Sequence, residues 1–257
     1  MPQFFVAAAD IHKKSFRLTG PEAFHVVKVL RFCRGQSIEL FDGKGGRFEG
    51  VIEDIGSDGV VTGRISATLK ADDARAPARV HLHLGLLKSS HWDYALEKGT
   101  ELGAASFTPI LTPRTVVLLH EVERARAKQD RWARVVMAAA KQCGRAELPP
   151  VHEPRPFRDA MRACKDRGLI LLAWEGMAGS TAGESLRAVL RAADAGRGAQ
   201  ALEVHLFVGP EGGFTEEEVE LAETEGAELF GLGPRVLRAE TAAAAATAIV
   251  QYELGGL

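Results

Sequence analysis

Residues 204–218 read VHLFVGPEGGFTEEE, an apolar run that passes into a loop with three glycines and then into an acidic stretch. The pattern predicts a strand that ends at Val208, a turn, and a helix that begins at Glu216. Thr215 stands where an N-cap belongs, and Glu218 is spaced for a capping box. Such a loop presents bare backbone to a small ligand, because glycine permits close approach and positive φ and the helix supplies unpaired N–H groups.

A second turn-rich run, LGPRVLRAET at residues 232–241, precedes another predicted helix. Pro210 and Pro234 both follow a predicted strand, and ligands bind at the carboxyl ends of strands in parallel sheets. The small side chains of residues 241–246 would let the last helix pack closely against another backbone. The two loops together predict a site for a flat, polar molecule. On spacing alone, two tight structural turns are an equally good interpretation.

The first seventy or so residues show β-type alternation with tight turns. Their hairpin signals are DGKG at 42–45 and GSDG at 56–59. One helix is predicted over Pro21–Arg31. Short strands joined by close turns predict a small β-barrel. The predicted strands are Phe4–Val6, Ser37–Phe41, Gly46–Ile52 and Val60–Ile65.

Strands alternate with helices from Arg79 onward, which predicts a mostly parallel α/β sheet. A polar, alanine-rich stretch precedes this region and reads as a linker. We therefore expect a barrel over 1–72, a linker over 73–78 and an α/β domain over 79–257. The predicted strands are Val80–Leu86, Phe107–Leu111, Leu169–Trp174, Val204–Val208 and Ala227–Phe230, and the predicted helices are Trp92–Leu102, Ala125–Gln142, Glu184–Ala193, Glu216–Glu225 and Thr241–Tyr252.

The composition is that of a soluble globular protein, with 46% hydrophobic and 26% charged residues among 257. The net charge of −2 gives no general attraction for nucleic acid, so any RNA contact has to come from a local basic patch. The three cysteines are far apart and show no CxxC spacing, which is typical of a reducing compartment. Without a long apolar segment, the chain is predicted to be cytoplasmic.

Several common catalytic motifs are missing from the sequence, among them GxSxG, the Walker A loop, HExxH and the dinucleotide-binding GxGxxG. His81 and His83 would lie on one face of a strand and could bind a metal ion. No third ligand stands out near them, however, and tetrahedral sites need at least three protein ligands. We therefore expect a structural role for both histidines.

The paired C-terminal loops closely resemble those of the SPOUT-class RNA methyltransferases, and within them the RsmE family, which methylates N3 of one uridine in 16S ribosomal RNA. Similar residues extend over nearly the whole chain. They include Lys98, Thr100–Gly103, Thr108–Pro109, Arg114, Arg131–Trp132, Gln142 and Arg145. The runs HVVKVLR at 25–31 and FDGKGG at 41–46 resemble the PUA-like β-barrel of that family. The resemblance implies a C-terminal trefoil knot that binds S-adenosylmethionine, a homodimer, and no metal cofactor.

Two departures from the family pattern concern the RNA-facing side. The family usually carries an arginine near the N-terminus, where this chain has Gln3. The segment before Lys98 often includes a glycine and an arginine in that family, whereas here Lys88 is followed by Ser89, Ser90 and His91. Both changes remove possible phosphate contacts, so they affect the expected RNA binding more than the methyl-donor site.

The resemblance also implies the roles of particular residues. Arg238 is the first candidate for catalysis, because a guanidinium could stabilise the negative charge on the uracil oxygens as N3 loses its proton. The alternative is an ion pair between Arg238 and Glu240 or Glu211. Glu211 itself is a candidate base or a residue that fixes its own loop. The expected donor-site residues are Gly209, Pro210, Glu211, Gly212, Gly213, Leu232, Gly233, Leu237 and Arg238.

Positive side chains are expected to anchor RNA phosphates while the pocket reads the base. The candidates are Lys28, Arg31, Lys44 and Arg47 in the barrel, and Lys88, Arg114 and Arg145 in the larger domain. Two other functions stay open. One is a SPOUT enzyme that modifies a ribose 2′-hydroxyl or a tRNA base, and the other is a non-catalytic RNA-binding or ribosome-assembly factor. The barrel and the full-length likeness favour 16S rRNA methylation.

Overall fold

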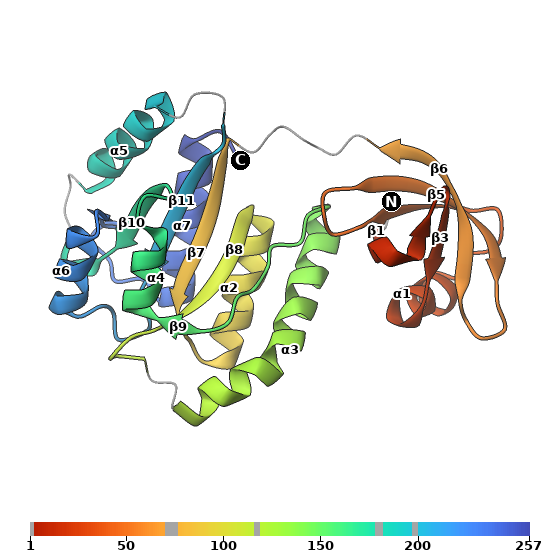
Figure 1. Ribbon diagram of the computed structural model, residues 1–257, viewed down its shortest axis with the longest axis horizontal. Helices are drawn as coiled ribbons and strands as arrows, with labels where there is room; N and C mark the ends of the chain where they lie inside the picture. The colour runs from red at the N-terminus through yellow and green to blue at the C-terminus, as the bar shows by residue number, and fades with distance from the viewer. Residues whose placement is uncertain (1–2, 70–76, 116–118, 178–181, 197–199) are drawn as a thin grey trace. The chain divides into compact units, whose positions relative to one another are not determined.

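The chain forms two compact units in the computed structural model, which describes residues 3–69, 77–115, 119–177, 182–196 and 200–257 (Figure 1). The first unit is Met1–Asp73 with Ala140–Leu148, and the second is Ala74–Ala139 with Pro149–Leu257. Residues 73–76 of the predicted linker lie outside the described residues. The linker prediction is wrong at Ala78, which is buried and begins a strand of the second unit.

The first unit is built on a six-stranded, curled sheet with the order β1-β4-β5-β6-β3-β2. The two predicted hairpins are confirmed, because β4 pairs antiparallel with β5, and β5 with β6. Its core is apolar throughout and includes Phe4, Phe16 and Ile38. The strands are β1 (Gln3–Phe5), β2 (Ile11–His12), β3 (Ser15–Leu18), β4 (Ser37–Phe41), β5 (Arg47–Ile55) and β6 (Val61–Leu69).

Two local features of the first unit differ from the sequence-based predictions. Strands β2 and β3 were not predicted, although β3 alternates exposed polar and buried apolar side chains. The predicted helix over Pro21–Arg31 is instead a short helix, α1 (Gly20–Phe24), that passes into a π-helical turn at His25–Val29. Arg31 then has a φ of 55°, a left-handed conformation that ends the helix.

A segment from the middle of the chain completes the first unit. Lys141 forms an ion pair with Glu22, with 2.8 Å between Nζ and Oε1. The backbone N–H of Leu148 donates to the carbonyl of Gly43 over 3.0 Å. Arg145 lies in this segment, so its assignment to the larger domain is wrong. The sequence pattern did not predict this return, because residues 140–143 end a helix, Leu119–Cys143, whose longer part belongs to the second unit.

The second unit contains a fully parallel sheet with the order β12-β10-β11-β7-β8-β9, as the alternation of strands and helices predicted. The strands are β7 (Ala78–Gly85), β8 (Ala104–Leu111), β9 (Arg155–Pro156), β10 (Leu169–Ala173), β11 (Leu202–Val208) and β12 (Glu228–Phe230). The helices are α2 (Ser89–Glu101), α3 (Leu119–Cys143), α4 (Phe157–Cys164), α5 (Ala182–Gly196), α6 (Glu216–Thr224) and α7 (Ala239–Glu253). Helix α4 and strand β9 were missed.

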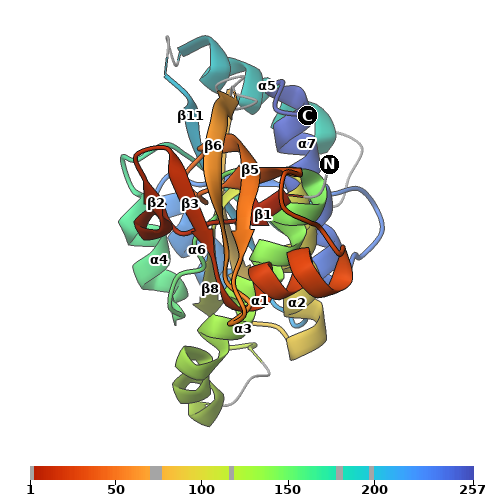
Figure 2. The same cartoon turned by 90° about the vertical axis from the view of Figure 1, so that its right-hand side faces the viewer.

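Helices cover both faces of this sheet (Figures 1 and 2). Helices α4 and α6 pack on one face, where Phe157, Phe207 and Phe214 belong to a single buried cluster. Helices α2 and α7 pack on the other face, against each other and against β7, β8 and β11. The long helix α3 is fixed to α2 by the rings of Trp92 and Trp132, whose centroids are 5.5 Å apart. Within the described part of the chain, no helix is both long and apolar enough to cross a membrane.

Candidate functional site

The two glycine loops line a cavity of about 360 Å³ in the second unit. The cavity lies at the carboxyl ends of β10 and β11, since Ala173 and Val208 are the last residues of these strands and both line it. The carboxyl edge of a parallel sheet is where open α/β folds bind ligands. The location predicted from Pro210 and Pro234 is therefore occupied by a cavity that both prolines line.

Eight of the nine expected donor-site residues line this cavity. They are Gly209, Pro210, Glu211, Gly213, Leu232, Gly233, Leu237 and Arg238. The ninth, Gly212, is not in the lining. An added Cβ at Gly212 would lie 2.9 Å from Cβ of Arg114, so this glycine lets the loop pass close to Arg114 instead.

The shape of the first loop depends on its glycines. Gly213 has a φ of 68°, and its N–H donates to the carbonyl of Pro210 over 2.9 Å. In the second loop Gly233 has a φ of 94°. These are left-handed conformations that cost little only for glycine, so the positive φ expected from the sequence is confirmed at one position in each loop.

Arg114 holds the first loop from the side. Its Nη1 donates to the carbonyl oxygens of Gly212, over 3.1 Å, and Phe214, over 3.0 Å. The loop then enters helix α6 through the predicted capping box, which is confirmed. Thr215 N–H donates to Oε2 of Glu218 over 2.9 Å, and Glu218 N–H donates to Oγ1 of Thr215 over 3.2 Å. Burial raises the pKa of Glu218, and the hydrogen bond from Thr215 N–H opposes this rise.

Gly85, the last residue of β7, allows Pro210 of the first loop to lie directly against the strand. A Cβ built on Gly85 would lie 2.3 Å from the backbone nitrogen of Pro210. We expect Gly85→Ala to displace Pro210, because backbone cannot rotate away as a side chain can. Overpacking of this kind costs about 1 to 3 kcal/mol, and a loss of ~1.4 kcal/mol in ligand contacts is a tenfold change in affinity.

The expected result is therefore an affinity for S-adenosylmethionine that falls about tenfold, measured by calorimetry on the purified variant. Gly196→Ala is the matched control, because nothing lies within 4 Å of a Cβ at that position. Its affinity should equal that of the wild type. An unchanged affinity in Gly85→Ala would mean that the loop position does not control ligand binding.

One wall of the cavity carries a histidine between two carboxylates. Nδ1 of His91 lies 3.9 Å from Oε1 of Glu211 and 3.8 Å from Oε2 of Glu240. Both Nδ1 of His91 and Oε2 of Glu240 are buried and have no hydrogen-bond partner among the described residues. His91 lies in the first turn of α2, Glu211 in the first loop and Glu240 in the first turn of α7. Three segments that are distant in sequence thus bring titratable groups to one place.

Arg238 is exposed at the start of α7 and lines the same cavity. No ion pair joins it to Glu211 or Glu240 among the described residues, and both carboxylates face His91 instead. The alternative role of Arg238 as an ion-pair partner thus has no support in this structure. Its guanidinium is available to a ligand.

The sequence-based prediction missed three polar or aromatic residues of the lining. His91 was interpreted as a lost phosphate contact, and Trp174 and Glu175 were not considered. Trp174 and Glu175 directly follow β10, whereas His91 lies in α2, six residues after the end of β7. The rule that parallel sheets bind ligands at this edge would have found Trp174 and Glu175 but not His91.

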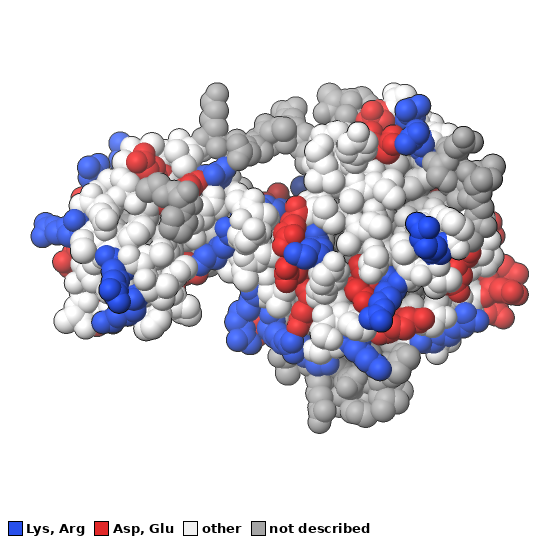
Figure 3. Space-filling model, turned by 180° about the vertical axis from the view of Figure 1, so that it is seen from behind, with Lys and Arg blue, Asp and Glu red and all other residues white. Residues whose placement is uncertain are grey.

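The seven candidate RNA-binding residues lie in different environments. Lys28, Arg31, Lys44 and Lys88 are exposed. Arg47 is less accessible, because its Nη2 lies 2.5 Å from Oε1 of Glu39 and only 16% of its side chain is exposed. Arg114 is engaged with the first loop, as described above. Figure 3 shows lysine and arginine side chains that stand out from the first unit, with acidic groups between them.

The cavity at the carboxyl edge of the parallel sheet is formed by the glycine loops and has Arg238 at its edge, which suits a small-ligand site in a chain that also carries a curled-sheet unit. Family models give its class. An RNA methyltransferase domain matches residues 74–251, and an RNA methyltransferase PUA domain matches residues 18–62. The first match covers most of the chain and contains the whole cavity.

Individual proteins give a closer relationship. Ribosomal RNA small subunit methyltransferase E from Bacillus subtilis is 32% identical over 93% of this chain and 90% of its own length. A crystal structure of the Neisseria gonorrhoeae enzyme of that name, bound to S-adenosylmethionine, is 26% identical with a TM-score of 0.80 and covers 98% of this chain and 97% of its own. A putative methyltransferase from Legionella pneumophila, also in complex with this cofactor, is 27% identical with a TM-score of 0.76 and covers 97% and 96%. The chain belongs to the ribosomal RNA small subunit methyltransferase E family.

Proposed function

We propose that this protein transfers a methyl group from S-adenosylmethionine to N3 of one uridine in 16S ribosomal RNA. The observation that carries the proposal is the single cavity that both glycine loops line, with Arg238 exposed at its edge. Relatives that share the fold are bound to S-adenosylmethionine in their crystal structures. Modification of ribose or of tRNA has no comparable support, because the relatives are named for the small ribosomal subunit.

The cavity suits the methyl donor in size and chemistry. Its volume of about 360 Å³ lies in the range of small-molecule sites. Backbone groups of Gly209, Gly213 and Gly233 can hydrogen-bond to an adenine edge, while Leu232 and Leu237 can pack on the ring faces. The carboxylates of Glu211 and Glu240 would favour a ligand that carries positive charge. S-adenosylmethionine, when bound, supplies a methyl group that its sulfonium has already activated.

The chemistry of the acceptor atom, N3 of uracil, determines what the protein has to do. N3 of uracil lies between two carbonyl groups and is a poor nucleophile while it carries its proton. It is also engaged when the base is paired, so the base has to be unpaired or flipped out to reach the cavity. The protein therefore has to remove one proton and stabilise the anion that results.

Arg238 and His91 can divide these two tasks. The guanidinium of Arg238 can donate hydrogen bonds to the uracil oxygens as negative charge develops on them. His91 faces Glu211 and Glu240 with Nδ1, so a proton on Nδ1 leaves the lone pair of Nε2 to accept the N3 proton. The imidazolium that forms is then stabilised by the two carboxylates. In this scheme Glu211 orients His91 and fixes its own loop instead of acting as the base.

The finer architecture is part of the proposal. We propose a trefoil knot in the C-terminal part, supported by helix α7, whose alanine-rich face packs against α2, β7 and β11. We also propose a homodimer, supported by Tyr94 of α2 and Ile249 and Tyr252 of α7, which are large apolar side chains left exposed on neighbouring helices. Sedimentation analysis tests the dimer, and a monomer at micromolar concentration would contradict it. The cytoplasm, where ribosomes are made, is the proposed location.

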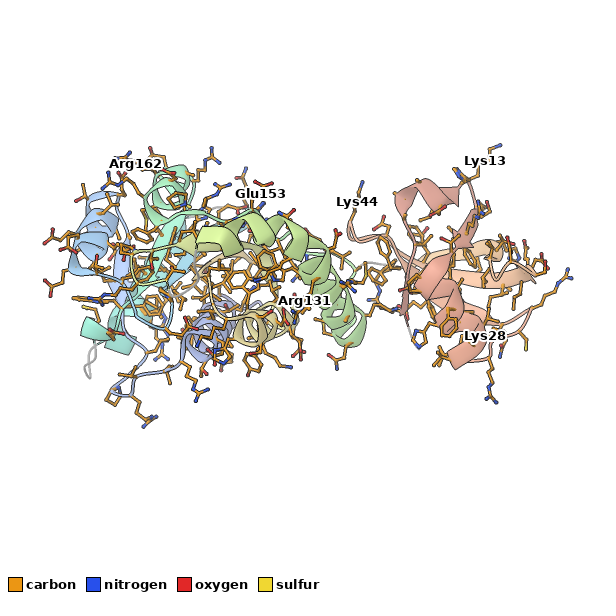
Figure 4. The ribbon with its side chains drawn as sticks, turned by 90° about the horizontal axis from the view of Figure 1, so that it is seen from below. Lys13, Lys28, Lys44, Arg131, Glu153 and Arg162 are labelled. Carbon is orange, nitrogen blue, oxygen red and sulfur yellow. The ribbon has the colours of Figure 1, made fainter. Side chains whose placement is uncertain are left out.

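The first unit is proposed to bind RNA through Lys28 and Arg31. We expect the double variant Lys28→Glu, Arg31→Glu to bind 16S rRNA more weakly and with a smaller salt dependence, because each lost phosphate contact lowers the slope of log K against log salt by about 0.7 to 0.9. The double variant Lys13→Glu, Lys14→Glu is the matched control, because it changes the net charge by the same amount and both lysines are exposed. Lys13 extends from the opposite side of the first unit in Figure 4 and is also exposed. Equal losses in both variants would point to net charge and contradict a specific RNA-binding face.

The decisive test of the activity uses labelled methyl donor and small ribosomal subunits from cells that lack the modification. The expected product is one methyl group per subunit on N3 of a single uridine, identified by nucleoside mass spectrometry and mapped by primer extension. Label on a ribose oxygen or on tRNA would identify a different enzyme. RNA binding without any transfer would identify an assembly factor.

A further inference from the structure

Three potential metal ligands meet on the sheet of the second unit, outside the cavity. They are His83 of β7, His205 of β11 and Cys164 of α4. Strands β7 and β11 are parallel and pair His81 with His205 and His83 with Phe207, so the four rings project from one face of the sheet. Helix α4 lies on this face and brings Cys164 to the rings (Figure 1).

Two of the three distances between the donor atoms match the edges of a tetrahedral metal site. Nε2 of His83 lies 3.3 Å from Nδ1 of His205, and Sγ of Cys164 lies 3.6 Å from Nε2 of His83. All three atoms lie within 4.8 Å of one another. Zinc–nitrogen bonds of about 2.0 to 2.1 Å and zinc–sulfur bonds of about 2.3 Å give tetrahedral edges of about 3.3 to 3.4 Å between nitrogens and about 3.5 to 3.6 Å between nitrogen and sulfur.

Contacts within the cluster and to the backbone leave two ring nitrogens without a partner. Nε2 of His83 contacts Nδ1 of His205 and Sγ of Cys164, and the thiol of Cys164 donates to the carbonyl of Ala160 over 3.1 Å. His83 is 7% exposed and Cys164 is 3% exposed. Nδ1 of His83 and Nε2 of His205 are buried without a hydrogen-bond partner among the described residues.

The surroundings support the cluster. His81 is fully engaged, with Nδ1 2.7 Å from Oγ of Ser106 and Nε2 2.6 Å from Oε2 of Glu203, and its ring stacks on that of His205 at 5.0 Å. It therefore orients His205 instead of being a fourth ligand.

We propose that His83, Cys164 and His205 bind one zinc-class divalent cation, with water as the fourth ligand. On binding, the metal–sulfur bond replaces the S–H bond of Cys164 and the proton passes to solvent. The cation would join α4 to the centre of the sheet. His205 lies three residues before Val208 of the cavity, about 10 Å along the strand, so the cation would stiffen the support of the methyl-donor site and take no part in the transfer.

Metal content of the purified full-length protein tests the proposal. After chelation, dialysis and titration with zinc, one equivalent should remain bound. Binding at 100 times the dissociation constant should raise the Tm by about 5 to 10 °C. Cobalt should give the intense visible bands of tetrahedral coordination and a thiolate-to-cobalt band. Protein that binds no zinc at one equivalent, or that binds only copper, would overturn the assignment.

Two variants locate the site. Cys164→Ser and His205→Gln should each weaken zinc binding by more than the roughly 10- to 100-fold that loss of an outer partner costs, and Cys164→Ser should abolish the thiolate-to-cobalt band. Cys33→Ser is the control, because Cys33 is an exposed free cysteine of the first unit. Equal loss in Cys33→Ser would overturn the site. If Cys164→Ser does not fold, His205→Gln and the cobalt spectrum of the wild type decide.

Discussion

Arg238→Ala is expected to lower kcat for rRNA methylation about 10²- to 10³-fold, the usual effect of losing one preorganised donor to a developing anion. The side chain is exposed at the cavity, and no ion pair to Glu211 or Glu240 restrains it among the described residues. The affinity for S-adenosylmethionine should change little, because backbone groups of the loops make most of the proposed donor contacts. Single-turnover methylation and calorimetry measure the two quantities separately.

Arg191→Ala serves as the control for this experiment. Arg191 is an exposed arginine of α5 in the same unit, and it does not line the cavity. Its loss removes the same charge, so its kcat should equal that of the wild type. Arg238→Lys should be intermediate, because lysine keeps the charge but not the planar fork of donors. Normal turnover by Arg238→Ala would exclude this residue from the mechanism.

His91→Ala is expected to lower kcat about 10²- to 10⁴-fold, the contribution that a positioned base makes to proton transfer. The pH profile distinguishes this role from a structural one. Without its base, the variant can use only uracil that has lost its N3 proton to solvent, so its rate should rise about tenfold per pH unit over the range in which that fraction grows. Quench-flow measurements between neutral and alkaline pH give this slope.

Three further variants complete the test of His91. His12→Ala removes an exposed histidine of the first unit and should leave kcat unchanged. Glu211→Gln and Glu240→Gln each remove one carboxylate that faces His91, and each should cost less than His91→Ala. A larger loss in Glu211→Gln than in His91→Ala would make Glu211 the base, the other role that its position allows.

Much of the fold could be predicted because it follows from local patterns. Glycine turns predicted the hairpins of the first unit, and alternating strands and helices predicted the parallel sheet of the second. Helix α4 was missed because it is short, and it begins directly after Pro156 with no polar cap. Strand β2 has only two residues, whereas β3 was missed although its side chains alternate between exposed and buried. The π-helical turn at His25–Val29 follows no residue pattern that the sequence analysis could use.

The candidate site was predictable where it consists of contiguous motifs. Glycine and proline mark the two loops in the sequence. Eight of the nine expected donor-site residues line one cavity. The arrangement of His91 with Glu211 and Glu240 was not predictable, because it joins three distant segments. The same holds for Cys164 and the histidines of β7 and β11, which only the packing of α4 on the sheet brings together.

The return of residues 140–148 to the first unit limits how this family can recombine its parts. A chimera made by exchanging everything before Ala74 would carry Glu22 from one parent and Lys141 from the other, and would pair Gly43 with a foreign Leu148. Residues 1–73 therefore do not make up the whole first unit. The unit also needs residues 140–148, which begin nearly seventy residues after Asp73. Residues 1–73 and residues 140–148 are therefore expected to evolve together.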